Sequence, residues 1–114
     1  MIALFSYGTL QQRGVQIATY GRELEGAPDA LLGYALAPLV IDDPHVVDVS
    51  GKAVHTIARK SGDPEDRISG LVFQLTDDEL RATDSYETDA YTRTEVILES
   101  GRTAFVYVAS ALGD

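Results

Sequence analysis

Two short stretches of this sequence hold residue types suited to binding a small anion and to moving a proton. In the first, near the N-terminus, an apolar run is interrupted by Tyr7, Gly8, Thr9 and Leu10. One interpretation is a bend that ends a strand, with Tyr7 as a core aromatic residue and Gly8 in a turn. The other is a turn with unpaired backbone N–H groups, which Gly8 would let converge on a carboxylate because glycine has no Cβ.

The second stretch holds Glu87, at the predicted junction between a helix and the strand that follows it. Catalytic groups often lie at such junctions, because the scaffold fixes the backbone while the side chain reaches a cleft. In a partly apolar pocket a carboxyl has a raised pKa, which suits a group that accepts and then returns a proton. The alternative is a solvated surface residue, and Asp84, one helical turn earlier, has the same alternative.

Short apolar runs separated by turn residues predict a β-rich domain with few helices. In the first half of the chain, the pattern predicts a strand at 1–6, a helix at 15–24, a turn at Gly26-Ala27-Pro28, apolar segments at 30–41, a hairpin turn at 50–52 and a loop at 61–64.

The second half of the chain has clearer boundaries. Apolar residues alternate with period two at 68–75, which predicts a strand. Thr76 and Glu79 have the spacing of a capping box, so we expect a helix to begin there and to end near 88–89. Two further strands, joined as a hairpin, are predicted at 91–99 and 103–109.

Composition narrows the class of protein. The chain has 114 residues, which fits one domain spanning 1–114, and 45% of them are apolar. It has no cysteine, so neither disulfides nor thiolate chemistry are expected. No apolar run is long enough to span a bilayer and the N-terminus has no signal-peptide pattern, so we expect a soluble, cytoplasmic protein without a membrane partner.

The charge and the histidines argue against two kinds of partner. The formal net charge is −9, with nine basic residues scattered among eighteen acidic ones, so nucleic acid is not an expected partner. A small anion would have to be held by local backbone N–H groups or by one placed arginine. His45 and His55 are far apart and show no metal-ligand spacing, so no metal site is predicted.

Five segments in order resemble the γ-glutamylcyclotransferase-like family, also called AIG2-like, which includes γ-glutamylamine cyclotransferase. They are FSYGTL near the N-terminus, LLGY at 31–34, ISGLVFQL, TDSYETDAYTRTEV and VYV. Each motif is short, but their order and spacing together are specific, and they extend from Phe5 to Val108.

The resemblance implies an α+β fold, a small mixed β-barrel flanked by short helices, and a site without a cofactor. It implies that Tyr7, Gly8, Thr9 and Leu10 bind the substrate and that Glu87 is the catalytic acid and base.

The strand residues that follow Glu87 are further candidates. The resemblance places Tyr91 and Arg93 in the same motif as Glu87, and Tyr107 is a further candidate for the pocket wall. Their alternative is packing or solvent exposure, with Arg93 paired to Asp84 or Glu95.

Two positions depart from the family pattern. Thr83 stands where the family usually has leucine, and we expect this change to affect packing only. Thr88 stands where it usually has glycine, and we expect a change in the backbone just after Glu87.

The activity that the resemblance implies is a cyclisation. The α-amine of a γ-glutamyl amine or γ-glutamyl amino acid would attack its own γ-carbonyl, which forms 5-oxoproline and releases the amine. The attack is intramolecular and therefore has a high effective molarity, so the enzyme mainly has to move protons. The alternative is a non-catalytic protein that binds a small ligand or a partner on the same fold.

Overall fold

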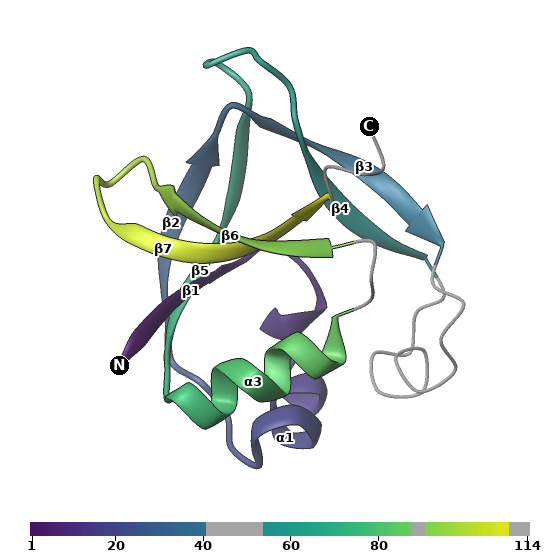
Figure 1. The fold of residues 1–114 in the computed structure, drawn as a ribbon, viewed down its shortest axis with the longest axis vertical. Helices are drawn as coiled ribbons and strands as arrows, with labels where there is room; N and C mark the ends of the chain where they lie inside the picture. The colour runs from purple at the N-terminus through teal and green to yellow at the C-terminus, as the bar shows by residue number, and fades with distance from the viewer. Residues whose placement is uncertain (41–53, 88–90, 110–114) are drawn as a thin grey trace.

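The computed structural model describes residues 1–40, 54–87 and 91–109. Figure 1 shows the path of the chain. In order, the elements are β1 (Ile2–Ser6), the 3-10 helix η1 (Thr9–Gln11), α1 (Arg13–Tyr20), β2 (Gly26–Leu32), β3 (Tyr34–Val40), β4 (Val54–Lys60), β5 (Arg67–Leu75), α3 (Asp77–Tyr86), β6 (Tyr91–Ile97) and β7 (Thr103–Ala109).

Five strands form one sheet in the order β2-β5-β1-β7-β6, and β3 and β4 form a separate antiparallel pair. The first strand is central and pairs antiparallel with β5 and parallel with β7. A parallel neighbour that lies far away in sequence places the end of β1 beside the C-terminal hairpin. The loop after β1 is therefore close to β7, which comes a hundred residues later.

Neighbouring residues of β1 belong to two different hydrophobic clusters. Leu4 packs with Val15 and Leu80 on the face covered by α1 and α3. Phe5 packs with Ala58 on the face covered by β3 and β4. Because side chains alternate along a strand, both faces of the five-stranded sheet are buried. Figure 1 shows the two helices lying together, away from β3 and β4.

The boundaries of the helices follow from local sequence signals. The predicted capping box is confirmed, since Thr76 Oγ1 accepts from Glu79 N at 3.1 Å and a Glu79 carboxylate oxygen accepts from Thr76 N at 2.9 Å. The first helix was predicted to end at residue 24 but ends at Tyr20. The reason is Gly21, whose φ of 72° is left-handed and stops the helix.

The predicted turn at Gly26-Ala27-Pro28 is wrong, because these residues begin β2 and pair with β5. Glycine is needed for this close pairing, since a Cβ on Gly26 would lie 2.7 Å from a ring carbon of Phe73. Proline is tolerated because β2 is an edge strand.

The second helix was predicted to end near 88–89 and ends at Tyr86, and the remaining predicted elements agree with the structure to within two residues where it describes them. Of the apolar stretch predicted at 30–41, residues 30–40 form the end of β2 and all of β3, which are divided by Gly33. The loop at 61–64 connects β4 to β5, and the C-terminal hairpin is β6 and β7. The hairpin turn predicted at 50–52 lies outside the described residues.

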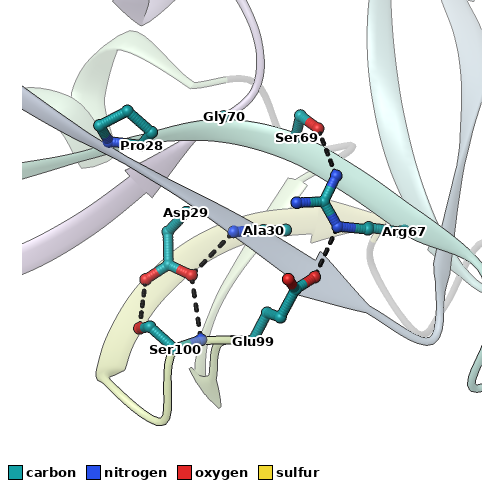
Figure 2. Close-up of a pocket in the computed structure, with 8 residues that line it drawn as sticks. All are labelled: Pro28, Asp29, Ala30, Arg67, Ser69, Gly70, Glu99 and Ser100. Carbon is teal, nitrogen blue, oxygen red and sulfur yellow. Dashed lines mark hydrogen bonds and ion pairs between the residues drawn. The ribbon is translucent and has the colours of Figure 1, made fainter.

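The α+β class is confirmed, while strand pairing among the described residues does not run around a closed barrel. The two edges of the sheet approach each other at one end, where Glu99 N donates to Ala30 O at 2.9 Å. Figure 2 shows the side chains that support this contact. The Asp29 carboxylate accepts from Ser100 Oγ at 2.5 Å, Ser100 N at 3.2 Å and Ala30 N at 2.8 Å.

The same cluster lines an open pocket of about 360 Å³, to which Arg67 and Glu99 also contribute. These two side chains form an ion pair at 2.5 Å, and Arg67 also donates to Ser69 at 2.9 Å. Because these charged and polar groups are paired with each other, the side chains that line the pocket join β2 and β5 to the turn between β6 and β7.

Candidate active site

Glu87 caps the C-terminal end of α3, as predicted. Its backbone N–H donates to Thr83 O at 3.0 Å, which completes the last turn of the helix. Its φ of −74° and ψ of 142° are extended, so the chain leaves the helix at this residue. The position of the carboxyl is therefore fixed by the helix on one side only.

The carboxyl of Glu87 has no hydrogen bond or ion pair with any residue in the described part of the chain. The residue keeps some solvent exposure, but protein atoms surround the carboxyl closely. This burial raises its pKa from 4.5 to about 8. A group with this pKa is mostly protonated at neutral pH and exchanges its proton easily near pH 8.

Four tyrosines from four different segments lie within electrostatic range of Glu87. Burial is the main cause that raises the pKa of each, and the negative charge of Glu87 raises it further. They are Tyr7 after β1, Tyr20 on α1, Tyr91 on β6 and Tyr107 on β7. The structure thus brings the predicted Tyr7, Tyr91 and Tyr107 together around Glu87, and their contact with a substrate stays a prediction.

The loop after β1 has the free backbone donors that its sequence suggested. Within the described residues, the N–H groups of Thr9 and Leu10 have no acceptor, because η1 begins here and its first bond is Gln11 N to Gly8 O at 3.1 Å. A Cβ on Gly8 would meet no atom of the described residues within 4 Å, so these residues leave space beside the loop. Thr9 Oγ1 lies 2.7 Å from Tyr86 Oη, which ties the loop to the residue before Glu87.

Two of the predicted binding residues have their side chains occupied within the protein. The Leu10 side chain is buried in the cluster under the helices, which leaves its N–H group as the part available to a ligand. The Tyr7 hydroxyl donates to Tyr107 O at 2.6 Å and accepts from Ala58 N at 2.9 Å. It therefore links β7 to β4, where no strand pairing joins them.

Arg93 pairs with Asp84, one of its two predicted alternatives. Its Nη1 lies 2.9 Å from Asp84 Oδ2, and its guanidinium lies 5.2 Å from the centre of the Phe105 ring. The other oxygen of Asp84 accepts from the Tyr107 hydroxyl at 2.5 Å. Asp84 is therefore joined to two of the predicted site residues.

A comparison with protein-family models matches residues 4–113 to Gamma-glutamyl cyclotransferase, AIG2-like. The chain belongs to this family. The matched region includes every predicted site residue, from Tyr7 to Tyr107. None of the curated proteins matches the sequence.

Several solved structures have the same fold as this AIG2-like chain. A gamma-glutamyl cyclotransferase aligns with a TM-score of 0.73 and 14% identity over 96% of this chain and 66% of that protein. An Arabidopsis thaliana protein aligns with a TM-score of 0.68 and 22% identity over 99% of this chain and 64% of that one. An uncharacterized Pyrococcus horikoshii protein aligns with a TM-score of 0.62 and 17% identity over 96% of this chain and 78% of that one. At these identities the likeness shows the fold alone.

The sequence did not reveal the roles of Tyr20 and Thr83. Tyr20 fell on the apolar face of a predicted helix, and nothing in its spacing relates it to Glu87. Thr83 is fully buried and donates to Glu79 O at 2.9 Å, so the Tyr20 hydroxyl donates to Thr83 Oγ1 at 2.6 Å. The departure from the family leucine thus supplies a hydrogen bond in addition to packing.

Two other expectations involve residues outside the described ranges. They are the change in the backbone expected at Thr88 and the absence of a metal site, which was argued partly from His45. Within the described ranges, no three His, Cys, Asp or Glu side chains gather closely enough to hold a metal ion. The same part of the chain has no helix that is both long and apolar enough to cross a membrane.

Proposed function

We propose that this chain is a γ-glutamyl cyclotransferase, which converts a γ-glutamyl amine or γ-glutamyl amino acid to 5-oxoproline and the free amine. The observation that carries the proposal is the Glu87 carboxyl, which has no partner among the described residues and a pKa of about 8. The helix cap is made by the Glu87 backbone, so among the described residues its carboxyl stabilises the fold through neither an ion pair nor a hydrogen bond. Family membership supports the same type of reaction.

The α-carboxylate of the substrate is proposed to bind the loop after β1. The free N–H groups of Thr9 and Leu10 are the donors, and Gly8 leaves room for the ligand beside them. Local donors are needed because the net charge of −9 repels an anion at longer range. Binding this end of the substrate would leave its α-ammonium and γ-amide to face Glu87.

In the proposed reaction, Glu87 moves one proton in two steps, first from the α-ammonium to itself and then from itself to the leaving nitrogen. Its carboxylate takes a proton from the α-ammonium, and the resulting amine nitrogen attacks the γ-carbonyl carbon to close a five-membered ring. Glu87 then gives the proton to the leaving nitrogen as the C–N bond breaks. The ring nitrogen, which still carries two protons of the former α-ammonium, loses one of them to the amine as the amine departs. The products are therefore 5-oxoproline, with one N–H, and the amine in its ammonium form, and Glu87 returns to its carboxylate form.

The raised pKa suits both proton transfers. A carboxyl near 4.5 would be a weak base toward an ammonium, whereas one near 8 is better matched to it. Because the carboxylate is the form that starts the reaction, kcat/KM should rise with pH up to about pH 8 and then level off.

The proposal is tested by incubating the pure protein with a panel of γ-glutamyl amines and γ-glutamyl amino acids and detecting 5-oxoproline by mass spectrometry. The matched control is each compound with its α-amine acetylated, because the blocked amine cannot attack. We expect product from at least one member of the panel and none from its acetylated form. If members bind but none gives product, the proposal is wrong and the non-catalytic alternative is supported.

A further inference from the structure

Asp84, Arg93 and Tyr107 form a chain of hydrogen bonds at the edge of the candidate site. Tyr107 Oη donates to Asp84 Oδ1 at 2.5 Å, and Arg93 Nη1 donates to Asp84 Oδ2 at 2.9 Å. The Arg93 and Asp84 side chains are 34% and 41% exposed. Because an ion pair this exposed contributes little to stability, holding the fold together does not account for the arrangement.

The Tyr107 hydroxyl is bonded to Asp84 and also lies near enough to Glu87 for the charge of Glu87 to raise its pKa. Asp84 is on the last turn of α3, and Glu87, three residues later, is the C-cap of the same helix, so both side chains start from its C-terminal end. The Tyr107 ring is buried, and its backbone oxygen holds the Tyr7 hydroxyl at 2.6 Å. Burial of the ring and the bond to Asp84 together hold the Tyr107 hydroxyl in place.

The bond to Asp84 decides what the Tyr107 hydroxyl can offer to a ligand. A tyrosine hydroxyl has one proton to donate, and here that proton points to Asp84. Among the described residues the Tyr107 oxygen has no second partner, so it presents only an acceptor. An ammonium group has three protons to donate and no acceptor, so it fits such an oxygen.

We propose, taking the substrate class from the function proposed above, that Asp84 is a positioning residue that makes the Tyr107 hydroxyl an acceptor for the substrate's α-ammonium. The ammonium lies between the Tyr107 oxygen and the Glu87 carboxylate. After Glu87 has taken one proton, the amine still donates one N–H to Tyr107. That bond directs the nitrogen lone pair toward the γ-carbonyl.

The experiment measures binding by calorimetry in a Glu87→Gln background, so that the substrate stays intact. The two ligands are a γ-glutamyl amide and the same molecule without its α-amine. Asp84→Ala and Tyr107→Phe should each weaken binding of the first ligand about tenfold, as expected for one hydrogen bond to a charged group. Neither should change binding of the second ligand by more than about twofold.

Two controls separate positioning from a general disturbance of α3. Asp78→Ala removes an exposed carboxylate paired with Arg81 on the same helix and should leave both affinities unchanged. Combining Asp84→Ala with Tyr107→Phe should weaken binding no more than either change alone, because Asp84 acts through Tyr107. In the protein with Glu87 intact, Asp84→Ala should raise KM more than it lowers kcat and should keep the dependence on pH near 8.

Each outcome bears on one of the two proposals. Equal losses for both ligands, or losses that add in the double variant, overturn the role of Asp84 even if the protein makes 5-oxoproline. A loss confined to the ligand with the α-amine supports that role even if no turnover is found, in which case only the cyclotransferase proposal fails. If neither variant affects either ligand, the role of Asp84 is wrong.

Discussion

Glu87, at the end of α3, and Asp29, in the middle of β2, are both acidic residues, but their surroundings are opposite. Asp29 is partly buried, which acts to raise its pKa, yet hydrogen bonds from Ser100 and Ala30 hold the pKa below its ordinary value. Glu87 has no such donors within the described residues, and burial raises its pKa to about 8. The contrast shows that a carboxyl with partners joins two parts of the fold, whereas one without them is available for proton transfer.

The largest expected effect comes from removing Glu87, the proposed proton-transfer group. Glu87→Gln keeps the size of the side chain, so the fold and substrate binding should survive while proton transfer is lost. We expect kcat to fall by roughly 10²- to 10⁴-fold, the usual contribution of a general acid or base. Steady-state assay of 5-oxoproline measures the loss, and Asp29→Asn, at the other end of the sheet, should leave kcat unchanged. A rate near that of the unmodified protein would place the base elsewhere.

The same substitution should change stability in a way that depends on pH. The pKa of Glu87 is about 8 in the folded state and near 4.5 when unfolded, so the group favours folding fully below pH 4.5. That advantage is lost as the pH rises to about 8, since the folded state must then ionise a buried carboxyl. Glu87→Gln should therefore raise Tm at pH 9 and change it little at pH 4.

Thermal unfolding at the two pH values tests this dependence. An equal change in Tm at both would show that ionisation of Glu87 is not the cause.

Removing the Asp29 carboxyl, which has hydrogen-bond partners, should lower stability and leave activity unchanged, the opposite of what is expected for Glu87. Asp29→Ala deletes the acceptor of three hydrogen bonds from Ser100 and Ala30. We expect it to lower the free energy of unfolding by about 1–3 kcal/mol, as for other lost hydrogen-bond partners, and to leave KM unchanged. Urea unfolding followed by circular dichroism measures the first quantity. A loss of activity without a loss of stability would contradict the structural role of Asp29.

How far the sequence predicts these two regions depends on how local the determinants are. The start of α3 follows from Thr76 and Glu79, which are only three residues apart. Glu87 lies at the predicted junction between this helix and the next strand. The strand at Gly26 was missed because its pairing with β5 is made by residues more than forty positions away. Local turn signals favoured the wrong conformation there.

The surroundings of Glu87 were even less accessible to prediction. Its surroundings come from separate elements: Tyr20 on α1 and Tyr107 on β7 are both near enough for the charge of Glu87 to raise their pKa. No spacing rule relates Tyr20 to Glu87, so only the resemblance to a family pointed to the site. The free N–H groups of Thr9 and Leu10 were suggested by the glycine before them, because that signal is local.

The smallest expected effect concerns Thr83, which connects Tyr20 to α3. Thr83→Val keeps the shape of the side chain but removes the acceptor of the Tyr20 hydroxyl. We expect a loss of about 1–2 kcal/mol in the free energy of unfolding, with kcat reduced several-fold at most. Thr94→Val on β6 is the control, since the Thr94 hydroxyl has only a weak bond at 3.5 Å to a nearby carbonyl. Equal losses in the two variants would show that the bond to Tyr20 is unimportant.

The most direct test of the account is a titration of the Glu87 carboxyl by carbon-13 NMR. The protein is labelled at the glutamate side-chain carboxyl carbons, and the Glu87 signal is assigned by its absence in Glu87→Gln. Burial without a partner predicts that this signal titrates with a midpoint near pH 8. A midpoint near 4.5 would show that Glu87 is solvated or paired in solution, and would contradict the view that it is held ready to exchange a proton.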